Sequence, residues 1–365
     1  MNSATRTDFF SSHAAQHGRP LLIAGPCSAE SAEQVLATAR ALLPARPALF
    51  RAGVWKPRTR PNSFEGFGSD ALRWLQQVKQ QTGLKVTTEV ANPQQAEEAL
   101  NYGIDVLWIG ARTTVNPFLV QDIADALRGT NVPVMVKNPV NPELQLWMGA
   151  IERLQQVGLN DIAAIHRGFS RYGTSLYRNP PTWQIPIELK KQLPDLPLFC
   201  DPSHIGGRRD LIQRISQKAL DLNYDGLMIE THPDPDAAMS DASQQITPTE
   251  LGLILEELVL RAPSTENPDY LLRQEEFRSR IDRIDRELVE ILAERMAVVE
   301  KLGEFKRQNN VTILQMERWK EIFETRPAWA KKLGVSAEFV SKLYEQIHLE
   351  SIRKQEEVMN RKDSL

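Results

Sequence analysis

Short apolar runs alternate with longer amphipathic stretches from residue 20 to about residue 260. The runs are rich in Val, Ile and Leu and have the length of strands, whereas stretches such as 32–43 and 70–81 have the apolar spacing of helices. Eight runs are predicted to be strands: 21–24, 49–51, 85–89, 106–109, 134–137, 162–166, 198–201 and 226–230. Eight strands alternating with helices predict a closed, parallel (β/α)8 barrel, the TIM barrel fold. An open doubly wound sheet is the competing architecture, but no glycine-rich dinucleotide fingerprint follows the first run.

The pattern changes after residues 261–268, a run rich in residues that interrupt helices and strands. Beyond it an apolar residue returns with a 4-3 spacing, which predicts a long amphipathic helix. The apolar stripe consists of Phe277, Ile281, Ile284, Leu288, Ile291, Val298, Leu302 and Phe305, and Arg295 takes the one slot that is not apolar. Further helices are predicted over 315–325 and 336–359. Three helices with a narrow apolar stripe cannot bury a large core alone, so we expect this segment to form a dimer.

These patterns predict two domains. The barrel is expected over residues 1–262, a linker over 263–270, and a small, all-α, three-helix domain over 271–365. The length of 365 residues allows a domain of roughly 250 residues plus a smaller one.

Composition narrows the possible functions. A formal net charge of -3 argues against bulk nucleic-acid binding. Two cysteines do not make a disulfide framework, which indicates a reducing compartment. The chain has no stretch of about 18 apolar residues that could span a membrane, and its polar N-terminus is a poor signal peptide. We therefore expect a cytoplasmic protein.

Chemically useful side chains follow the ends of the predicted strands, where the loops of a barrel converge on one mouth. Cys27, His204, Glu230 and Asp241 form a thiolate, imidazole and carboxylate set, which suits a divalent transition metal. Cys27 and His204 could instead be structural, since buried cysteines and hydrogen-bonded loop histidines are common. His166, His232 and Cys200 lie nearby in sequence and could replace a ligand.

Four cations also follow strands, namely Lys56, Arg112, Lys137 and Arg167. Side chains of like sign packed together lack compensation unless an anion binds. Arg offers a planar fork and Lys a point charge, so the set suits a small substrate that carries carboxylate and phosphate groups. A second phosphate would bind Arg58 and Thr59.

In the helical segment, Arg295 and Lys306 are eleven residues apart, so they share one face of the predicted helix. A cation in an apolar stripe needs a carboxylate partner or an anionic ligand, or it sets the helix register or reaches out to solvent. Ser351 and Gln355, spaced i and i+4 on the last helix, could face the same cavity.

The strand-end motifs resemble those of a known family. They are Ala24-Gly-Pro-Cys-Ser28, Arg51 with Lys56-Pro-Arg-Thr59, Gly110-Ala-Arg-Thr-Thr114, Asp201-Pro-Ser-His204, Met228-Ile-Glu230 and Ser240-Asp241. They look like the type I 3-deoxy-D-arabino-heptulosonate 7-phosphate (DAHP) synthases, with the closest match to the short β subgroup. The Lys-Pro-Arg-Thr run is the most specific, because the sibling synthase that uses arabinose 5-phosphate carries a Lys-Ala-Asn-Arg type run there.

The resemblance implies a metal-dependent condensation of phosphoenolpyruvate with erythrose 4-phosphate. It implies one divalent ion per barrel on Cys27, His204, Glu230 and Asp241, with manganese favoured and iron, cobalt or zinc as alternatives. Phosphoenolpyruvate would bind Arg51, Lys56, Ala111, Arg112, Lys137 and Arg167, and erythrose 4-phosphate would bind Arg58, Thr59 and Ser203. Lys56 would act between the two substrates, and Glu89 would order the attacking water.

The C-terminal segment resembles the all-helical chorismate mutases, which convert chorismate to prephenate. The resemblance implies catalytic roles for Arg295 and Lys306 and a chorismate site of Arg278, Arg295, Lys306, Arg318, Ser351 and Gln355. It also implies a homodimer in which Arg278 enters the site from the partner. Gln315 and Trp319 stand where that family usually has an Asp and a Glu. The Glu normally receives a substrate hydroxyl, so its loss is expected to lower the efficiency of the mutase.

A second hypothesis gives the helical segment no catalytic task. In it the segment is a dimerisation and sensing module that binds chorismate or prephenate and regulates the barrel. In either case a ligand of the helical site is expected to inhibit the synthase if it prefers one arrangement of the two domains.

Overall fold

The computed structural model describes residues 9–10, 20–57 and 64–361. The chain divides into two compact units, Met1–Pro263 and Ser264–Leu365, and each is considered by itself. Among the described residues, none of the helices combines the length and apolar character needed to cross a bilayer.

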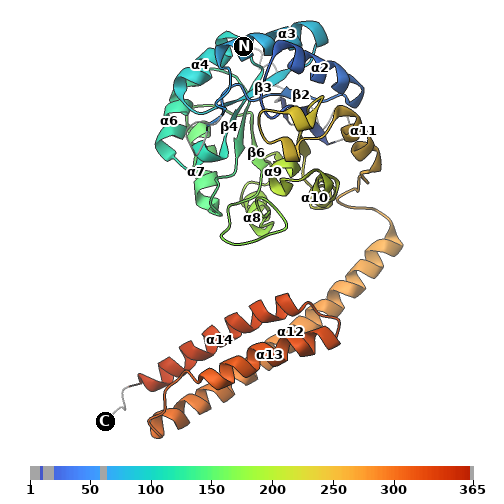
Figure 1. The fold of residues 1–365 in the computed structure, drawn as a ribbon. Coiled ribbons are helices and arrows are strands. Elements are labelled where there is room, and N and C mark those ends of the chain that lie inside the picture. Colours follow the sequence, from blue (N-terminus) through green and yellow to red (C-terminus); the bar gives the residue numbers. More distant parts are fainter. Residues whose placement is uncertain (1–8, 11–19, 58–63, 362–365) are drawn as a thin grey trace, which may run out of the picture. The chain divides into compact units, whose positions relative to one another are not determined.

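The first unit is a closed barrel of eight parallel strands, which confirms the predicted fold (Figure 1). The strands are β1 (Leu21–Gly25), β2 (Leu49–Arg51), β3 (Val86–Val90), β4 (Val106–Ile109), β5 (Val134–Lys137), β6 (Ile162–His166), β7 (Leu198–Cys200) and β8 (Gly226–Glu230). Each pairs with the next in sequence, and β8 pairs with β1 to close the ring. Because all eight run parallel, their carboxyl ends meet at one mouth.

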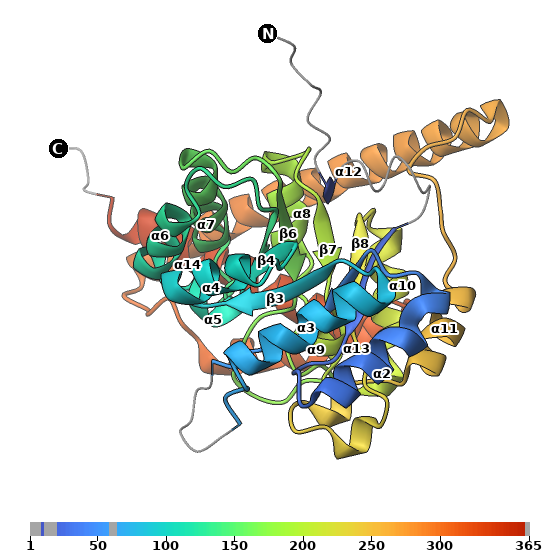
Figure 2. The same cartoon turned by 90° about the horizontal axis from the view of Figure 1, so that it is seen from above.

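Helices surround the strands on the outside of the ring (Figures 1 and 2). They are α2 (Ala32–Leu42), α3 (Ser69–Thr82), α4 (Pro93–Asn101), α5 (Ala111–Thr114), α6 (Pro117–Ala126), α7 (Leu144–Gln156), α8 (Gln184–Gln192), α9 (Pro202–Gly206), α10 (Ile212–Asp221) and α11 (Pro248–Glu257). Short 3-10 turns lie at Leu43–Ala45, Arg209–Leu211, Pro235–Ala237 and Ala242–Gln244. Several helices begin at a polar cap, such as Ser31, whose side chain accepts a hydrogen bond from the backbone N–H of Gln34.

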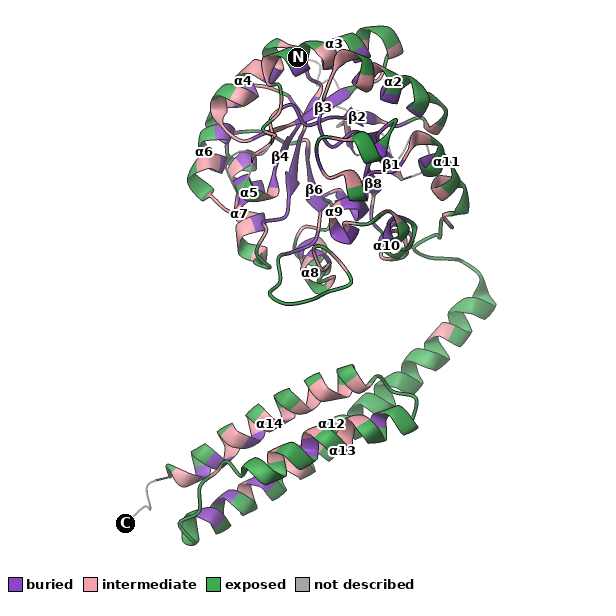
Figure 3. Ribbon diagram, viewed as in Figure 1, coloured by how far each residue is buried: buried purple, intermediate pink, exposed green. Residues whose placement is uncertain are grey.

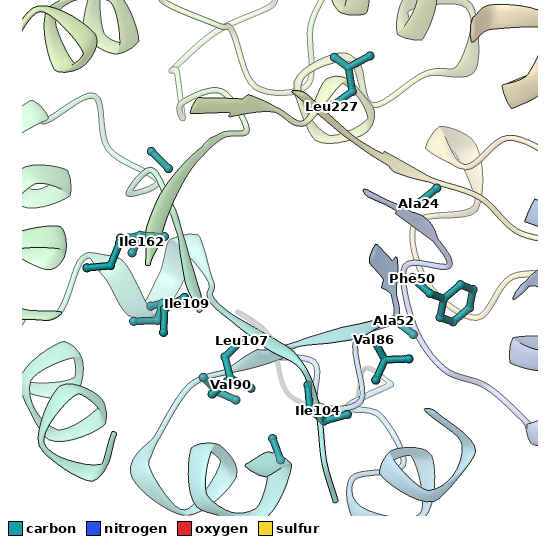
Figure 4. Packing of buried hydrophobic residues seen from close by; sticks show 14 of the residues in the cluster. Ala24, Phe50, Ala52, Val86, Val90, Ile104, Leu107, Ile109, Ile162 and Leu227 are labelled. Carbon is teal, nitrogen blue, oxygen red and sulfur yellow. The ribbon is translucent and has the colours of Figure 1, made fainter. Parts of the chain in front are cut away.

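The strands separate two apolar layers. The outer layer fills the space between strands and helices, and Figure 4 shows Phe50, Leu107 and Leu227 on that side of the ring. The inner layer fills the barrel with side chains such as Trp108 and Met135, so the interior is a packed core and not a channel. Nearly every barrel strand is therefore buried on both faces (Figure 3), which explains their almost continuous apolar character.

The described part of the second unit, residues 264–361, contains three helices, α12 (Pro268–Gln308), α13 (Met316–Lys332) and α14 (Ala337–Met359). α14 packs against both α12 and α13. The expected linker is too long by three residues, because α12 begins at Pro268 after Asn267 caps it. The expected end of the second helix is also wrong, because α13 continues through Pro327 to Lys332. Figure 3 shows that the first half of α12 is almost entirely exposed within this chain, with Gln274 the intermediate exception among residues 268–288.

Candidate functional site

The mouth of the barrel brings together three of the four predicted metal ligands. The ligand atoms of Cys27, Glu230 and Asp241 lie within 4.8 Å of one another. Cys27 follows β1, Glu230 ends β8, and Asp241 lies in the loop between β8 and α11. Gly25 of β1 pairs with Glu230 of β8, so closure of the barrel itself brings the thiol beside the first carboxylate.

The fourth predicted ligand, His204, lies beside this group. Its Nε2 is 3.7 Å from Oε1 of Glu230, and its Nδ1 is 2.8 Å from Oδ2 of Asp201. Asp201 also caps α9, because its Oδ1 accepts a hydrogen bond from the backbone N–H of His204. With Nδ1 held by Asp201, Nε2 is the nitrogen that faces the cluster, an arrangement typical of metal-binding histidines.

This donor set fits a divalent metal ion. Burial, followed by the charge of Glu230, raises the pKa of the Cys27 thiol to about 12. The thiol therefore keeps its proton at neutral pH unless a cation compensates for the lost hydration. Nζ of Lys56 lies 2.9 Å from Sγ and supplies part of that charge. A thiolate and an imidazole beside two carboxylates suit a borderline ion such as manganese, iron, cobalt or zinc.

The residues that could have replaced a ligand make other contacts. Cys200 lies in the outer apolar layer of the barrel. Nε2 of His166 donates to a backbone carbonyl at 2.6 Å, and its Nδ1 accepts from the hydroxyl of Tyr224 at 2.9 Å. Nε2 of His232 lies 3.5 Å from a carboxylate oxygen of Glu30. The geometry therefore favours His204 as the imidazole beside Cys27.

Two of the residues predicted to bind phosphoenolpyruvate hold carboxylates in place. Nη2 of Arg51 lies 3.0 Å from Oε1 of Glu230, and Nζ of Lys137 lies 2.8 Å from Oδ2 of Asp201. All four side chains are almost fully buried. Through Asp201, Lys137 is linked to His204, so one of the predicted anion-binding cations and one of the predicted metal ligands share one ion-pair network.

Arg167 lies among other guanidinium groups. Burial lowers its pKa to about 10, and the positive charges of Arg178 and Arg112 act in the same direction, although Asp201 opposes them. Like charges gathered in a buried place favour the arrival of an anion. This corner of the mouth has the chemistry expected for a carboxylate or phosphate.

Glu89 and Ala111 lie on the third and fourth strand ends. Oε2 of Glu89 accepts a hydrogen bond from the indole N–H of Trp108 at 3.0 Å. Gly110 packs directly against the Glu89 carboxylate, and any side chain at this glycine would collide with it. Ala111 follows as the first residue of α5.

The residues predicted to bind the aldose phosphate are only partly described. Ser203 is fully buried, and its Oγ accepts a hydrogen bond from the backbone N–H of Glu230 at 3.0 Å. It therefore lies at the end of β8, beside the ligand group. Arg58 and Thr59 lie outside the described residues.

The helical unit forms a second polar cluster. Nη1 of Arg295 donates to Oγ of Ser351 at 2.7 Å, and Nε2 of Gln355 donates to the carbonyl oxygen of Ser351 at 3.2 Å. Nζ of Lys306 donates to the carbonyl oxygen of Ile313 at 2.6 Å. Lys306, Ser351 and Gln355 are buried, which is unusual for polar residues in so small a unit.

Two predicted chorismate-binding residues lie apart from these contacts. Arg318 is more than half exposed and pairs with Glu321 on its own helix at 2.6 Å, although its charge acts on Arg295. Arg278 is 17 residues before Arg295 on α12, which separates them by about 25 Å along the helix. Arg278 therefore cannot join the cluster of its own chain.

Comparison with known proteins assigns both units to families. Residues 11–261 match the DAHP synthetase I family. The chain belongs to the DAHP synthetase I family. Residues 277–356 match chorismate mutase type II, so this DAHP synthetase I family member also carries a chorismate mutase type II domain.

Relatives of this family member include two kinds of aldolase. The chain is 32% identical over 225 residues to a phospho-2-dehydro-3-deoxyheptonate aldolase of Thermotoga maritima, a match that covers 62% of the chain and 64% of the relative. The chain thus spans just under two thirds of that relative's length. It is 30% identical over 262 residues to a 2-dehydro-3-deoxyphosphooctonate aldolase of Nitratidesulfovibrio vulgaris, covering 67% of the chain and 93% of the relative.

Solved structures agree with the barrel. A phospho-2-dehydro-3-deoxyheptonate aldolase (DAHP synthase) of Thermotoga maritima superposes with a TM-score of 0.60 at 29% identity, covering 66% of this chain and 68% of that one. A truncated form of the Thermotoga maritima synthase gives a TM-score of 0.58 at 27% identity, with coverage of 66% and 86%.

The residues that hold Cys27, Glu230 and Asp241 in place were not identified from the sequence. Nε2 of Gln244 donates to Oε2 of Glu230 at 2.7 Å, and Oε1 of Gln245 accepts from the backbone N–H of Cys27 at 2.9 Å. Nη1 of Arg178 lies 2.9 Å from Oδ1 of Asp241. Arg178 lies in a loop, and the two glutamines lie in and directly after a short 3-10 turn, where no periodicity indicates which way a side chain points.

Proposed function

We propose that the barrel condenses phosphoenolpyruvate with erythrose 4-phosphate to DAHP and belongs to the β subgroup. The observation that carries this proposal is the convergence of Cys27, Glu230 and Asp241, with His204 alongside, next to buried cations in a DAHP synthetase I barrel. When bound on these four residues, a divalent metal ion would supply Lewis acidity for an aldehyde carbonyl.

The protein side chains would orient and neutralise the substrates. Arg112, Arg167 and Lys137 would bind the phosphate and carboxylate of phosphoenolpyruvate with the backbone at Ala111. The support is that the charges of Arg112 and Asp201 both act on Arg167, and that Lys137 pairs with the same Asp201. Lys56, 3.1 Å from the carbonyl oxygen of Cys27, would stand between the two substrates.

Three roles complete the proposal. Glu89 would hold the attacking water, and the indole N–H of Trp108 fixes its carboxylate for that task. Arg51 would contribute positive charge to the phosphoenolpyruvate side while it keeps Glu230 in position. Ser203, with Arg58 and Thr59, would bind the phosphate of erythrose 4-phosphate.

An assay of the purified chain tests the synthase. Because the relatives include both heptonate and octonate aldolases, phosphate release from phosphoenolpyruvate is measured with erythrose 4-phosphate and, separately, with arabinose 5-phosphate. We expect turnover with the four-carbon aldose, loss of turnover with a chelator, and recovery with manganese. Preference for arabinose 5-phosphate, or full activity in the chelator, would contradict the proposal.

We further propose that the helical unit converts chorismate to prephenate. The support is the buried cluster of Arg295, Lys306, Ser351 and Gln355 in a chorismate mutase type II domain. The rearrangement needs no nucleophile, only donors that hold two carboxylates and an ether oxygen in a compact conformer. We expect wild-type mutase activity that Arg295→Ala abolishes. A wild-type chain without it would favour the alternative, a sensing module.

The mutase site would be completed by a second copy of the chain. All eight apolar positions of the α12 stripe are exposed, from 45% at Leu302 to 64% at Phe305. Pairing two such stripes would cover them and bring Arg278 of one copy toward Arg295 of the other. Both cysteines are free and buried, which suits the reducing cytoplasm, where we propose that the enzyme works.

A further inference from the structure

A third polar residue, His348, lies on the face of α14 that carries Ser351 and Gln355. His348, Ser351 and Gln355 are spaced i, i+3 and i+7, so their side chains lie on one side of the helix. Ser351 accepts a hydrogen bond from Arg295, which shows that this side faces the cationic positions of α12. His348 therefore belongs to the same cluster, although no motif in the sequence indicates it.

The cluster has many donors and few acceptors. Oγ of Ser351 is already used, because it accepts from Arg295 and donates to the carbonyl oxygen of Ile347 at 2.6 Å. Nε2 of His348 and Oε1 of Gln355 are buried and have no hydrogen-bond partner among the described residues. A buried polar atom without a partner costs free energy, which a ligand that supplies the missing donor would recover.

Neighbouring groups fix the ring of His348 and keep it neutral. Trp319 of α13 packs against it in an edge-on arrangement, with 3.9 Å between the ring centroids. Trp319 itself carries only an N–H donor and cannot accept a hydrogen bond. Burial, followed by the charges of Arg295 and Lys306, lowers the pKa of His348, so the imidazole is neutral at pH 7 and one ring nitrogen can accept.

We propose that Nε2 of His348 accepts a hydrogen bond from the ring hydroxyl of chorismate, which makes His348 a substrate-binding residue. The inference rests on the proposed mutase function. The carboxylates and ether oxygen of chorismate are acceptors and match the cations of the cluster. Its hydroxyl is a donor and needs the acceptor that His348 presents. The proton of the neutral ring then lies on Nδ1.

The test combines protein variants with a substrate lacking the hydroxyl. Mutase kcat/KM is measured for wild type, His348→Leu and His348→Gln with chorismate and with its ring-deoxy analogue. With chorismate, we expect His348→Leu to lose roughly three- to tenfold and His348→Gln to keep most of the activity, since the amide oxygen can accept. With the analogue, wild type and His348→Leu should be equal. Gln346→Leu, at an exposed position of α14, is the matched control.

The outcomes separate this inference from the proposed function. An inactive wild type would overturn the mutase and the inference with it. An active wild type in which His348→Leu turns over chorismate normally, or loses activity equally on both substrates, would overturn the inference alone. Circular dichroism and thermal melting of each variant establish that α14 remains folded, so that a loss on chorismate alone is not an effect of unfolding.

Discussion

Cys27 is the residue on which the metal proposal depends most directly. Its thiol is fully buried between Glu230 and Asp241, so it is available as a thiolate only when a cation binds. We expect Cys27→Ala to lower metal affinity and synthase activity by more than about 100-fold. Loss of a residue that only hydrogen-bonds to a metal ligand typically costs about 10- to 100-fold, and loss of a ligand itself should cost more. The measurements are metal content of the dialysed protein and DAHP formation after metal add-back. Cys200→Ala is the matched control, because that buried thiol lies in the outer layer.

Normal turnover of Cys27→Ala after chelation and metal add-back would contradict the ligand assignment. Mutase activity measured on the same sample reports whether the helical unit is intact. An unchanged thermal melting temperature would show that the barrel is folded as well.

His166 makes the stability of the barrel depend on pH. Burial, followed by the charge of Arg167 in the same direction, lowers the pKa of His166 to about 3 from an ordinary value of 6.5. The folded protein thus keeps the ring neutral, whereas the unfolded chain takes up a proton below pH 6.5. The stabilising contribution is fully present above pH 6.5 and is lost as the pH falls toward 3, at up to about 1.4 kcal/mol per pH unit.

Urea unfolding between pH 7 and 4, with chelator throughout, measures this dependence. His166→Asn should be less stable at pH 7, because it loses one or both ring hydrogen bonds, but its free energy of unfolding should fall less steeply with acid. Carboxylates titrate in both proteins, so the difference between the two slopes isolates the histidine. Equal slopes would mean that His166 is not held neutral.

At the residue scale, sequence motifs could predict which side chains gather but not how they are held. Cys27, Glu230 and Asp241 follow strand ends, and the barrel rule places all such ends at one mouth. Gln244 and His348 could not be predicted in this way. Their contacts depend on a loop conformation in one case and on which helix packs opposite in the other.

At the element scale, periodicity located every barrel strand but misjudged one helix end. The sequence pattern predicts the second C-terminal helix over 315–325, two residues short of Pro327, a residue that removes a backbone donor from a helix. α13 instead continues to Lys332. Beyond the proline, Ala330 is buried, and the guanidinium of Arg326 lies 4.5 Å from the ring centroid of Trp329 on the same helix, so burial and a local side-chain contact accompany the extra turn.

The exposed stripe of α12 yields a prediction about assembly. Ile284 and Ile291 are 50% and 61% exposed, and pairing with a second copy would bury them. Changing either to Glu places a charge in the paired stripe, so we expect the dimer to dissociate by light scattering. Mutase activity should fall with it, because Arg278 would no longer reach the site. Ser279→Glu, on the exposed polar side of the same helix, should leave both unchanged. A wild-type monomer with full mutase activity would contradict the shared site.

At the scale of the whole molecule, one chain joins a DAHP synthetase I barrel, for which we propose phosphoenolpyruvate as a substrate, to a chorismate mutase type II domain. A ligand changes the activity of a distant site only if it binds two arrangements of the molecule with different affinity. We expect saturating prephenate to weaken phosphoenolpyruvate binding by roughly five- to 150-fold, the usual range of coupling between sites, and so to slow DAHP formation when phosphoenolpyruvate is below saturation. Arg295→Ala, which weakens the helical site, should be resistant while its uninhibited synthase rate stays normal.

Binding linkage supplies an independent check on that coupling. If prephenate weakens the binding of phosphoenolpyruvate by some factor, phosphoenolpyruvate must weaken the binding of prephenate by the same factor. Calorimetry of the full chain with each ligand, in the presence and absence of the other, measures both quantities. Inhibition without this reciprocal change in affinity would mean that prephenate lowers the turnover rate of the barrel and does not weaken the binding of phosphoenolpyruvate. Equal synthase rates with and without prephenate would contradict the prediction, because they would show that ligand binding at the helical site does not affect the barrel.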